Sequence, residues 1–146
     1  MFKHILICTD GSPLSTKAAK TGIALAKALH AKVTVYCALE DLLPVYSDGY
    51  AFDQLTIDRF EEGVRTLAQK RVDAIGKLAK AARVPFAALV TKAYAPDEGI
   101  INAAKKQKCD AIIMASHGRS GISKLFMGSV TQKVLSHSRI PVVVCR

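Results

Sequence analysis

The chain has 146 residues, of which 50% are hydrophobic, so it is long enough for one domain with a buried core, over residues 1–146. This composition excludes an intrinsically disordered chain. The formal net charge is +9. Near the amino terminus, the apolar run at residues 5–8 is too short for a signal peptide or a membrane span, which predicts a cytoplasmic protein without membrane contact.

Five short apolar runs along the chain are typical of buried strands. They cover residues 4–9, 32–39, 86–91, 110–115 and 141–145. Most are bounded by turn or charged residues, and they are apolar on both faces. This pattern predicts strands of a parallel sheet that is covered by helices on both sides.

Helical periodicity fills most of the sequence between these runs. A first helix is predicted to begin at Ser12-Pro13, where serine can cap the amino terminus and proline suits the first turn. Its apolar stripe consists of Ala18, Ala19, Gly22, Ile23, Ala26 and Leu29. A long second helix is predicted over residues 52–82, with an apolar stripe of Phe60, Val64, Leu67, Val72, Ile75, Leu78 and Ala82.

Two shorter helices complete the pattern. The third is predicted to open at Pro96, with acids in its first turn, and to close on Lys105 and Lys106, which matches the helix dipole at both ends. The fourth runs from Gly128-Ser129 to Ser136-His137. Alternating strands and helices of this kind predict a single-domain, Rossmann-like α/β fold with an open five-stranded parallel sheet and right-handed crossovers. Residues 40–51 are predicted to form a loop beside the strand ends.

Cysteine spacing and charge distribution limit the possible chemistry. Cys8, Cys37, Cys109 and Cys145 form no C-x-x-C pair or metal-ligand cluster, which predicts small buried side chains in a reducing compartment. Residues 40–62 hold seven of the 12 acidic residues and a single base, Arg59, so the rest of the chain is strongly basic. Because the lysines lie along helices without interleaved aromatics, solvated helix faces are expected rather than nucleic-acid binding.

The end of the first strand carries polar residues. In an open α/β sheet, ligands bind at the carboxyl ends of the strands, and Thr9, Asp10 and Ser12 lie at such an end. Asp10 could accept hydrogen bonds from a ribose or hold a hydrated Mg²⁺. Equally, Asp10 and Ser12 could serve only to stabilise the turn and cap the helix.

A second candidate segment follows the fourth strand. It runs from Met114 through Ala115-Ser116-His117-Gly118-Arg119 and enters a helix at Gly128-Ser129-Val130-Thr131. Glycines allow backbone N–H groups to approach phosphate oxygens, and the hydroxyls of Ser129 and Thr131 can add donors. The segment matches neither a Walker A loop nor G-x-G-x-x-G. On residue types alone it is a generic phosphate-binding loop or an ordinary turn.

Over its whole length the chain resembles the universal stress protein family. The segments that carry the resemblance are residues 3–12, 110–121, 128–135 and 141–144, in the family's order and separation. The resemblance implies a strand order of 3-2-1-4-5. The ATP-binding branch of that family carries G-x₂-G-x₉-G-[S/T], which corresponds here to Ala115, Gly118, Gly128 and Ser129. Alanine at position 115 departs from the pattern, because the family has glycine there.

The resemblance also implies a site for ATP or AMP, with Mg²⁺ held near Asp10 through the nucleotide. Asp10 would lie near the ribose or metal, the backbone of Ala38 and Leu39 would meet the adenine, and Gly118, Gly128, Ser129 and Thr131 would hold phosphates. The remaining members of the expected site are Thr9, Ser12, Met114, His117, Arg119 and Val130. We expect His117 to structure the loop rather than act as a base, since no neighbouring carboxylate orients it. Arg119 and Lys124 could neutralise phosphate or simply be solvated.

The last predicted strand, residues 141–145, would lie at an exposed edge, and such edges invite pairing. The family pairs them across a two-fold axis, which implies a homodimer. The sequence therefore favours an adenine-nucleotide-binding stress-response module that acts as a dimer. Two alternatives stay open: a nucleotide-free dimer that works through protein contacts, and a slow ATPase or phosphotransferase.

Overall fold

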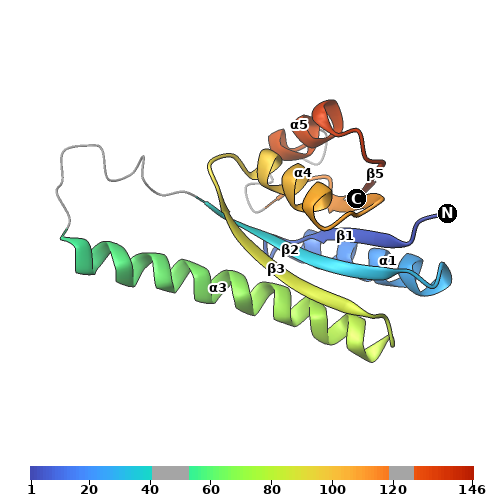
Figure 1. Cartoon of the computed structure of the whole chain (residues 1–146), viewed down its shortest axis with the longest axis horizontal. Helices are drawn as coiled ribbons and strands as arrows, with labels where there is room; N and C mark the ends of the chain where they lie inside the picture. Colours follow the sequence, from blue (N-terminus) through green and yellow to red (C-terminus); the bar gives the residue numbers. More distant parts are fainter. Residues whose placement is uncertain (41–52, 119–126) are drawn as a thin grey trace.

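A single parallel sheet organises the chain in the computed structural model, which describes residues 1–40, 53–118 and 127–146. The strands are β1 (His4–Cys8), β2 (Lys32–Glu40), β3 (Phe86–Ala93), β4 (Ala111–Ala115) and β5 (Val142–Cys145). Their order is β3-β2-β1-β4-β5, and every neighbouring pair is parallel (Figure 1). The predicted fold class and strand order are confirmed. Glu40 belongs to β2, and residues 41–51 of the predicted loop lie outside the described residues.

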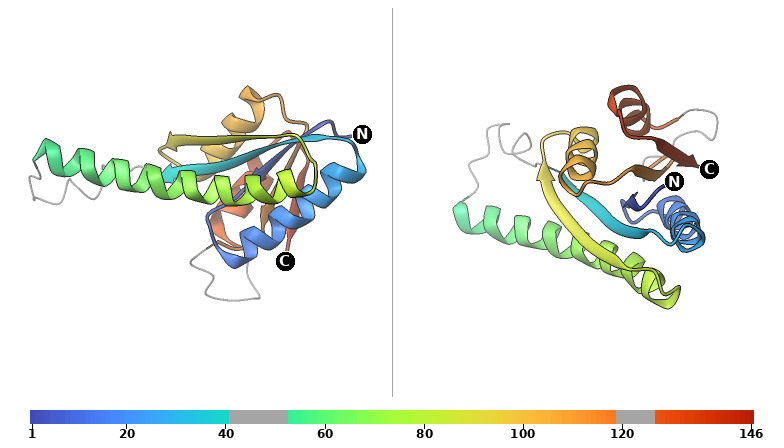
Figure 2. Two further views of the ribbon diagram at one scale, coloured as in Figure 1. Left: turned by 90° about the horizontal axis from the view of Figure 1, so that it is seen from below. Right: turned by 45° about the vertical axis from the view of Figure 1, so that its right-hand side comes forward.

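Helices cover the sheet on both faces, as the apolar strands require. They are α1 (Pro13–Ala28), α3 (Gln54–Ala81), α4 (Pro96–Lys106) and α5 (Ser129–His137). Helices α1 and α3 lie on one face, and α4 and α5 lie on the other (Figure 2). Since β1 and β4 are adjacent in the centre, their carboxyl ends meet at the point where the chain switches direction across the sheet.

Helix α1 packs closely against β1 and β4. All residues of both strands are buried. Gly22 of α1 lies directly over this pair, and a Cβ atom there would be 2.9 Å from Ile7 Cδ1 and 3.2 Å from Ile113 Cδ1. The absence of a side chain therefore lets the helix backbone approach the sheet closely.

The predicted helix ends agree with the structure. The Ser12 side chain accepts a hydrogen bond from the Ser15 backbone N–H (3.1 Å), and Pro13 occupies the first turn of α1. Helix α4 begins with Asp97 and Glu98 in its first turn and ends on lysines. Caps and charges of this kind satisfy the free backbone groups and the dipole at helix ends, so the local sequence fixes these boundaries.

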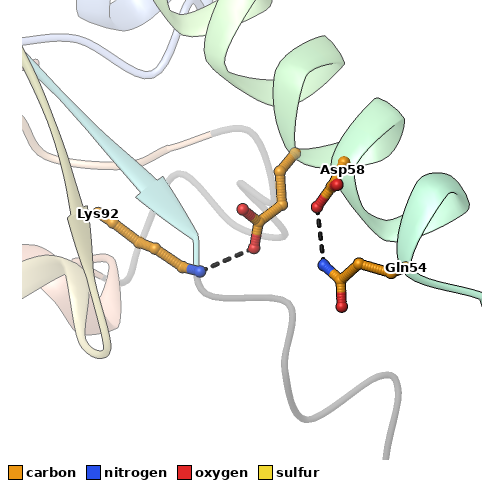
Figure 3. Close-up of polar contacts among 4 residues, drawn as sticks. Gln54, Asp58 and Lys92 are labelled. Carbon is orange, nitrogen blue, oxygen red and sulfur yellow. Dashed lines mark hydrogen bonds and ion pairs between the residues drawn. The ribbon is translucent and has the colours of Figure 1, made fainter.

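The predicted apolar stripe of α3 is wrong at two positions. Phe60 is 50% exposed and Leu67 is 49% exposed, whereas Ala68 and Ala79 are buried instead. The reason is that the amino-terminal half of α3 extends beyond the sheet (Figure 1). This half is joined to β3 by an ion pair from Lys92 Nζ to Glu61 Oε1 (2.8 Å), shown in Figure 3 beside the Gln54–Asp58 hydrogen bond.

The cysteines are free thiols and largely buried. Cys8, Cys37 and Cys109 are buried, and Cys145 on the edge strand is partly buried. Burial raises the pKa of Cys109 to about 11. Within the described ranges, no group of three or more His, Cys, Asp or Glu side chains could hold a metal ion. No described helix is long and apolar enough to cross a membrane.

Candidate functional site

The turn after β1 is held by its own side chains. The Gly11 N–H donates to Thr9 Oγ1 (3.2 Å), and the Ser12 N–H donates to Asp10 Oδ1 (3.0 Å). Gly11 has a φ of +81°, a conformation that favours glycine. One carboxylate oxygen of Asp10 therefore stabilises the turn. This is the structural one of the two roles predicted for Asp10, the other being ligand binding.

The other oxygen of Asp10 faces the loop that follows β4. A Cβ atom added to Gly118 would lie 2.9 Å from Asp10 Oδ2. The glycine thus allows the carboxylate to approach the backbone of the second predicted segment. The two strand ends that the sequence singled out are in contact.

Two hydrogen bonds fix the start of α5 against the end of β4, and a third joins the end of β4 to β5. Gly128 N–H donates to Ser116 O (2.8 Å), Ser116 N–H donates to Cys145 O (2.8 Å), and Thr131 Oγ1 donates to Ala115 O (3.0 Å). The first backbone N–H groups of a helix have no partner within the helix, so the amino terminus of α5 is a ready anion site. The Thr131 hydroxyl proton is already used, which leaves its backbone N–H and the exposed Ser129 as donors.

Ala115 fits the backbone without strain. It is the last residue of β4 and is 7% exposed, and it is not among the residues with positive φ. An alanine side chain therefore costs nothing in backbone conformation at the position where the family motif has glycine.

A cavity of about 330 Å³ opens between these two strand ends. Most of the predicted site residues line it: Thr9, Asp10, Ala38, Met114, Ala115, His117, Gly118, Gly128, Ser129, Val130 and Thr131. Ser12 does not, because it is buried as the cap of α1. The Leu39 side chain packs into the core on the α1 and α3 face. Arg119 and Lys124 lie outside the described residues.

Seven lining residues were not predicted: Cys8, Ser15, Tyr36, Cys37, Arg71, Pro96 and Ile100. Ser15 lies one turn into α1, and its hydroxyl is 3.2 Å from Thr9 Oγ1. Pro96 and Ile100 come from the start of α4, whose amino terminus was predicted but not placed beside the cavity. Arg71 comes from the middle of α3, where no motif marks it.

Among the described residues, His117 is held at one ring nitrogen. Its Nδ1 lies 2.9 Å from Ser116 Oγ, a hydrogen bond whose direction depends on the tautomer. Its Nε2 is buried and has no hydrogen-bond partner among the described residues. A buried polar nitrogen without a partner at a cavity wall is costly unless a ligand or water supplies the bond.

The lining combines apolar side chains, such as Ile100 and Met114, with Asp10, free helix N–H groups and hydroxyls. A mostly apolar cavity with a few convergent polar groups, at the switch point of a parallel sheet, is typical of a site for a phosphate-bearing cofactor or nucleotide. Fold and cavity together define an open α/β protein of the Rossmann-like class with a cavity at its switch point.

Comparison with known proteins gives the family. The sequence profile of the universal stress protein family matches residues 1–146, and the chain belongs to this family. A universal stress protein of Thermus aquaticus is 29% identical over 146 residues, which cover both chains completely. YxiE, a universal stress protein of Bacillus subtilis, is 28% identical over 157 residues with the same complete coverage.

Solved structures share the fold. Universal stress protein UspA from Lactobacillus plantarum superimposes with a TM-score of 0.82 over 99% of this chain and 97% of that one, at 18% identity. A universal stress protein in complex with cAMP has a TM-score of 0.73 at 21% identity, with coverage of 99% and 97%. The protein from Archaeoglobus fulgidus in complex with dAMP has a TM-score of 0.67 at 15% identity, with coverage of 100% and 98%.

Proposed function

We propose that this chain binds an adenine nucleotide, ATP or AMP, in the cavity between β1 and β4, and that it serves as a nucleotide-responsive module in a stress response. The observation that carries the proposal is the amino terminus of α5, which opens onto the cavity lined by Asp10, Gly118 and Gly128. Two universal stress proteins of the same fold have solved structures in complex with the adenine nucleotides cAMP and dAMP.

Each part of the ligand has matching chemistry in the lining. Phosphate oxygens would accept from backbone N–H groups at the start of α5 and from the Ser129 hydroxyl. Asp10 would accept from a ribose hydroxyl or hold a Mg²⁺ that arrives with the phosphates. The adenine would lie toward Ala38, where Pro96 and Ile100 of α4 add apolar surface.

The lining residues do not form a metal site by themselves. Asp10 is the single carboxylate among the described lining residues. Mg²⁺ usually binds to one or two carboxylates together with substrate phosphates and water. The donor set therefore fits a Mg²⁺ that arrives with a di- or triphosphate, and Asp10 would hold it at the phosphate wall.

Nucleotide binding is expected to raise the melting temperature. A ligand that binds only the folded state stabilises it by RT ln(1 + [L]/Kd), which amounts to about 2.7 kcal/mol at a hundredfold excess over Kd. Differential scanning fluorimetry with ATP, AMP and GTP measures the shift, and GTP serves as the control for the base. No shift with either adenine nucleotide at millimolar concentration would contradict the proposal.

We also propose that the chain forms a homodimer through β5. This strand lies at one edge of the sheet, and its four residues are all only partly buried. An apolar edge strand carries unpaired backbone groups that a second copy can satisfy. Sedimentation equilibrium is expected to give twice the monomer mass. Pro141 O and Cys145 O accept hydrogen bonds from the β4 side, so by alternation the N–H of Val144 points to the open edge, and Val144→Pro is expected to reduce the mass because proline removes that donor. A monomeric wild-type chain at micromolar concentration would refute the dimer.

A further inference from the structure

Arg71 reaches the cavity from the middle of α3 by passing over Gly11. A Cβ atom at Gly11 would lie 2.7 Å from Arg71 Nε and 2.9 Å from Arg71 Cδ. Any side chain at position 11 would collide with this arginine. Gly11 therefore does two things: it adopts a positive φ, and it leaves the space through which Arg71 becomes part of the cavity wall.

The charges of the cavity lining indicate a role for Arg71 in binding phosphate. Among the described lining residues, the ionised side chains are Asp10 and Arg71. Asp10 Oδ2 faces the Gly118 backbone, on the wall where the start of α5 would receive phosphates. A carboxylate there repels a phosphate, and the repulsion is stronger in a partly buried cavity than in water. A cation beside Asp10 offsets it.

We propose that Arg71 binds the phosphate groups of the nucleotide and thereby determines the preference of this site for phosphorylated over unphosphorylated adenine ligands. The proposal rests on the nucleotide-binding function proposed above. Arg71 lies next to Gly11 and lines the same cavity as the amino terminus of α5, so both are available to the phosphates of one nucleotide.

Arginine is well suited to this position. Its guanidinium keeps its charge at all physiological pH values, and its planar fork can donate two parallel hydrogen bonds to phosphate oxygens. Lysine carries the same charge but as a single point with three rotating donors. Lysine at position 71 should therefore preserve less of the preference for phosphorylated ligands than arginine does. A neutral residue of similar length at this position should abolish the preference.

The test is isothermal titration of the wild-type chain and three variants with ATP, AMP and adenosine. Arg71→Met is expected to weaken ATP binding about tenfold or more and to leave adenosine binding within about twofold. Arg71→Lys should give an intermediate ratio of ATP to adenosine affinity. The matched control is Arg65→Met, which removes one positive charge from an exposed position on the same helix that does not line the cavity. It should leave all three affinities unchanged.

The outcomes separate this inference from the proposed function. If the wild-type chain binds ATP and Arg71→Met keeps the same ATP-to-adenosine ratio, the inference is wrong while nucleotide binding stands. An equal loss for ATP and adenosine also overturns it, because Arg71 would then contact the nucleoside or support the fold. If the wild-type chain binds no adenine ligand, the proposed function fails. Circular dichroism verifies folding, and Arg71→Lys decides the question if Arg71→Met does not fold.

Discussion

Ile113→Ala is expected to lower the free energy of unfolding by about 2–5 kcal/mol, since large-to-small substitutions in a core lose transfer energy and leave a cavity. Ile113 is completely buried in the interior strand β4, pairs in register with Ile7 of β1, and lies under Gly22 of α1. Little collapse can fill the space, because rigid sheet surrounds it and the facing helix residue has no side chain. Urea unfolding followed by circular dichroism measures the change.

A matched control is Leu55→Ala, which truncates an aliphatic residue that is 60% exposed on the projecting half of α3. Surface substitutions of this kind usually change stability by less than about 0.5 kcal/mol. A loss at Ile113 no larger than the loss at Leu55 would show that β4 is not the centre of the core. Equal m-values in both variants would show that the two transitions expose the same surface, so the midpoints report stability directly.

Gly118→Val is expected to weaken nucleotide binding about a hundredfold, equivalent to about 2.7 kcal/mol. The added Cβ would lie 2.9 Å from Asp10 Oδ2, so the carboxylate or the loop must move. Rotation of the carboxylate breaks its hydrogen bond with the Ser12 N–H, and the two branches of valine enter the phosphate wall. Since Gly118 is exposed and its φ is not positive, the fold should tolerate the change. Titration with ATP and a thermal melt measure both effects.

The control for this substitution is Gly63→Val on α3. A Cβ atom at Gly63 meets nothing within 4 Å, so the same change in residue type occurs there in open space. ATP affinity should be unchanged in this variant. If Gly118→Val binds ATP with wild-type affinity, the nucleotide does not contact the cavity wall between Asp10 and α5. The proposed position of the phosphates would then be wrong.

Much of the fold follows from local patterns in the sequence. The apolar runs define the strands to within one or two residues. Ser12-Pro13 marks the start of α1 because capping chemistry acts over a single turn, and Gly128-Ser129 marks the start of α5, where no side chain caps the helix. Because alternating strands and helices give a parallel sheet, the carboxyl ends of the strands lie at one edge. For this reason the sequence already places the Asp10 turn and the Gly118 loop at the same edge of the sheet.

What the sequence alone determined is therefore the parallel sheet, its helices and the two strand ends that form most of the cavity. The tertiary structure alone decided that Phe60 and Leu67 face solvent and that Arg71 reaches the cavity across Gly11. Periodicity tells which side of a helix is apolar, but not how far the helix extends past the sheet it covers. Whether a side chain from α3 meets a turn about 60 residues earlier depends on how closely two backbones pack, and that distance is set by every layer of the core between them.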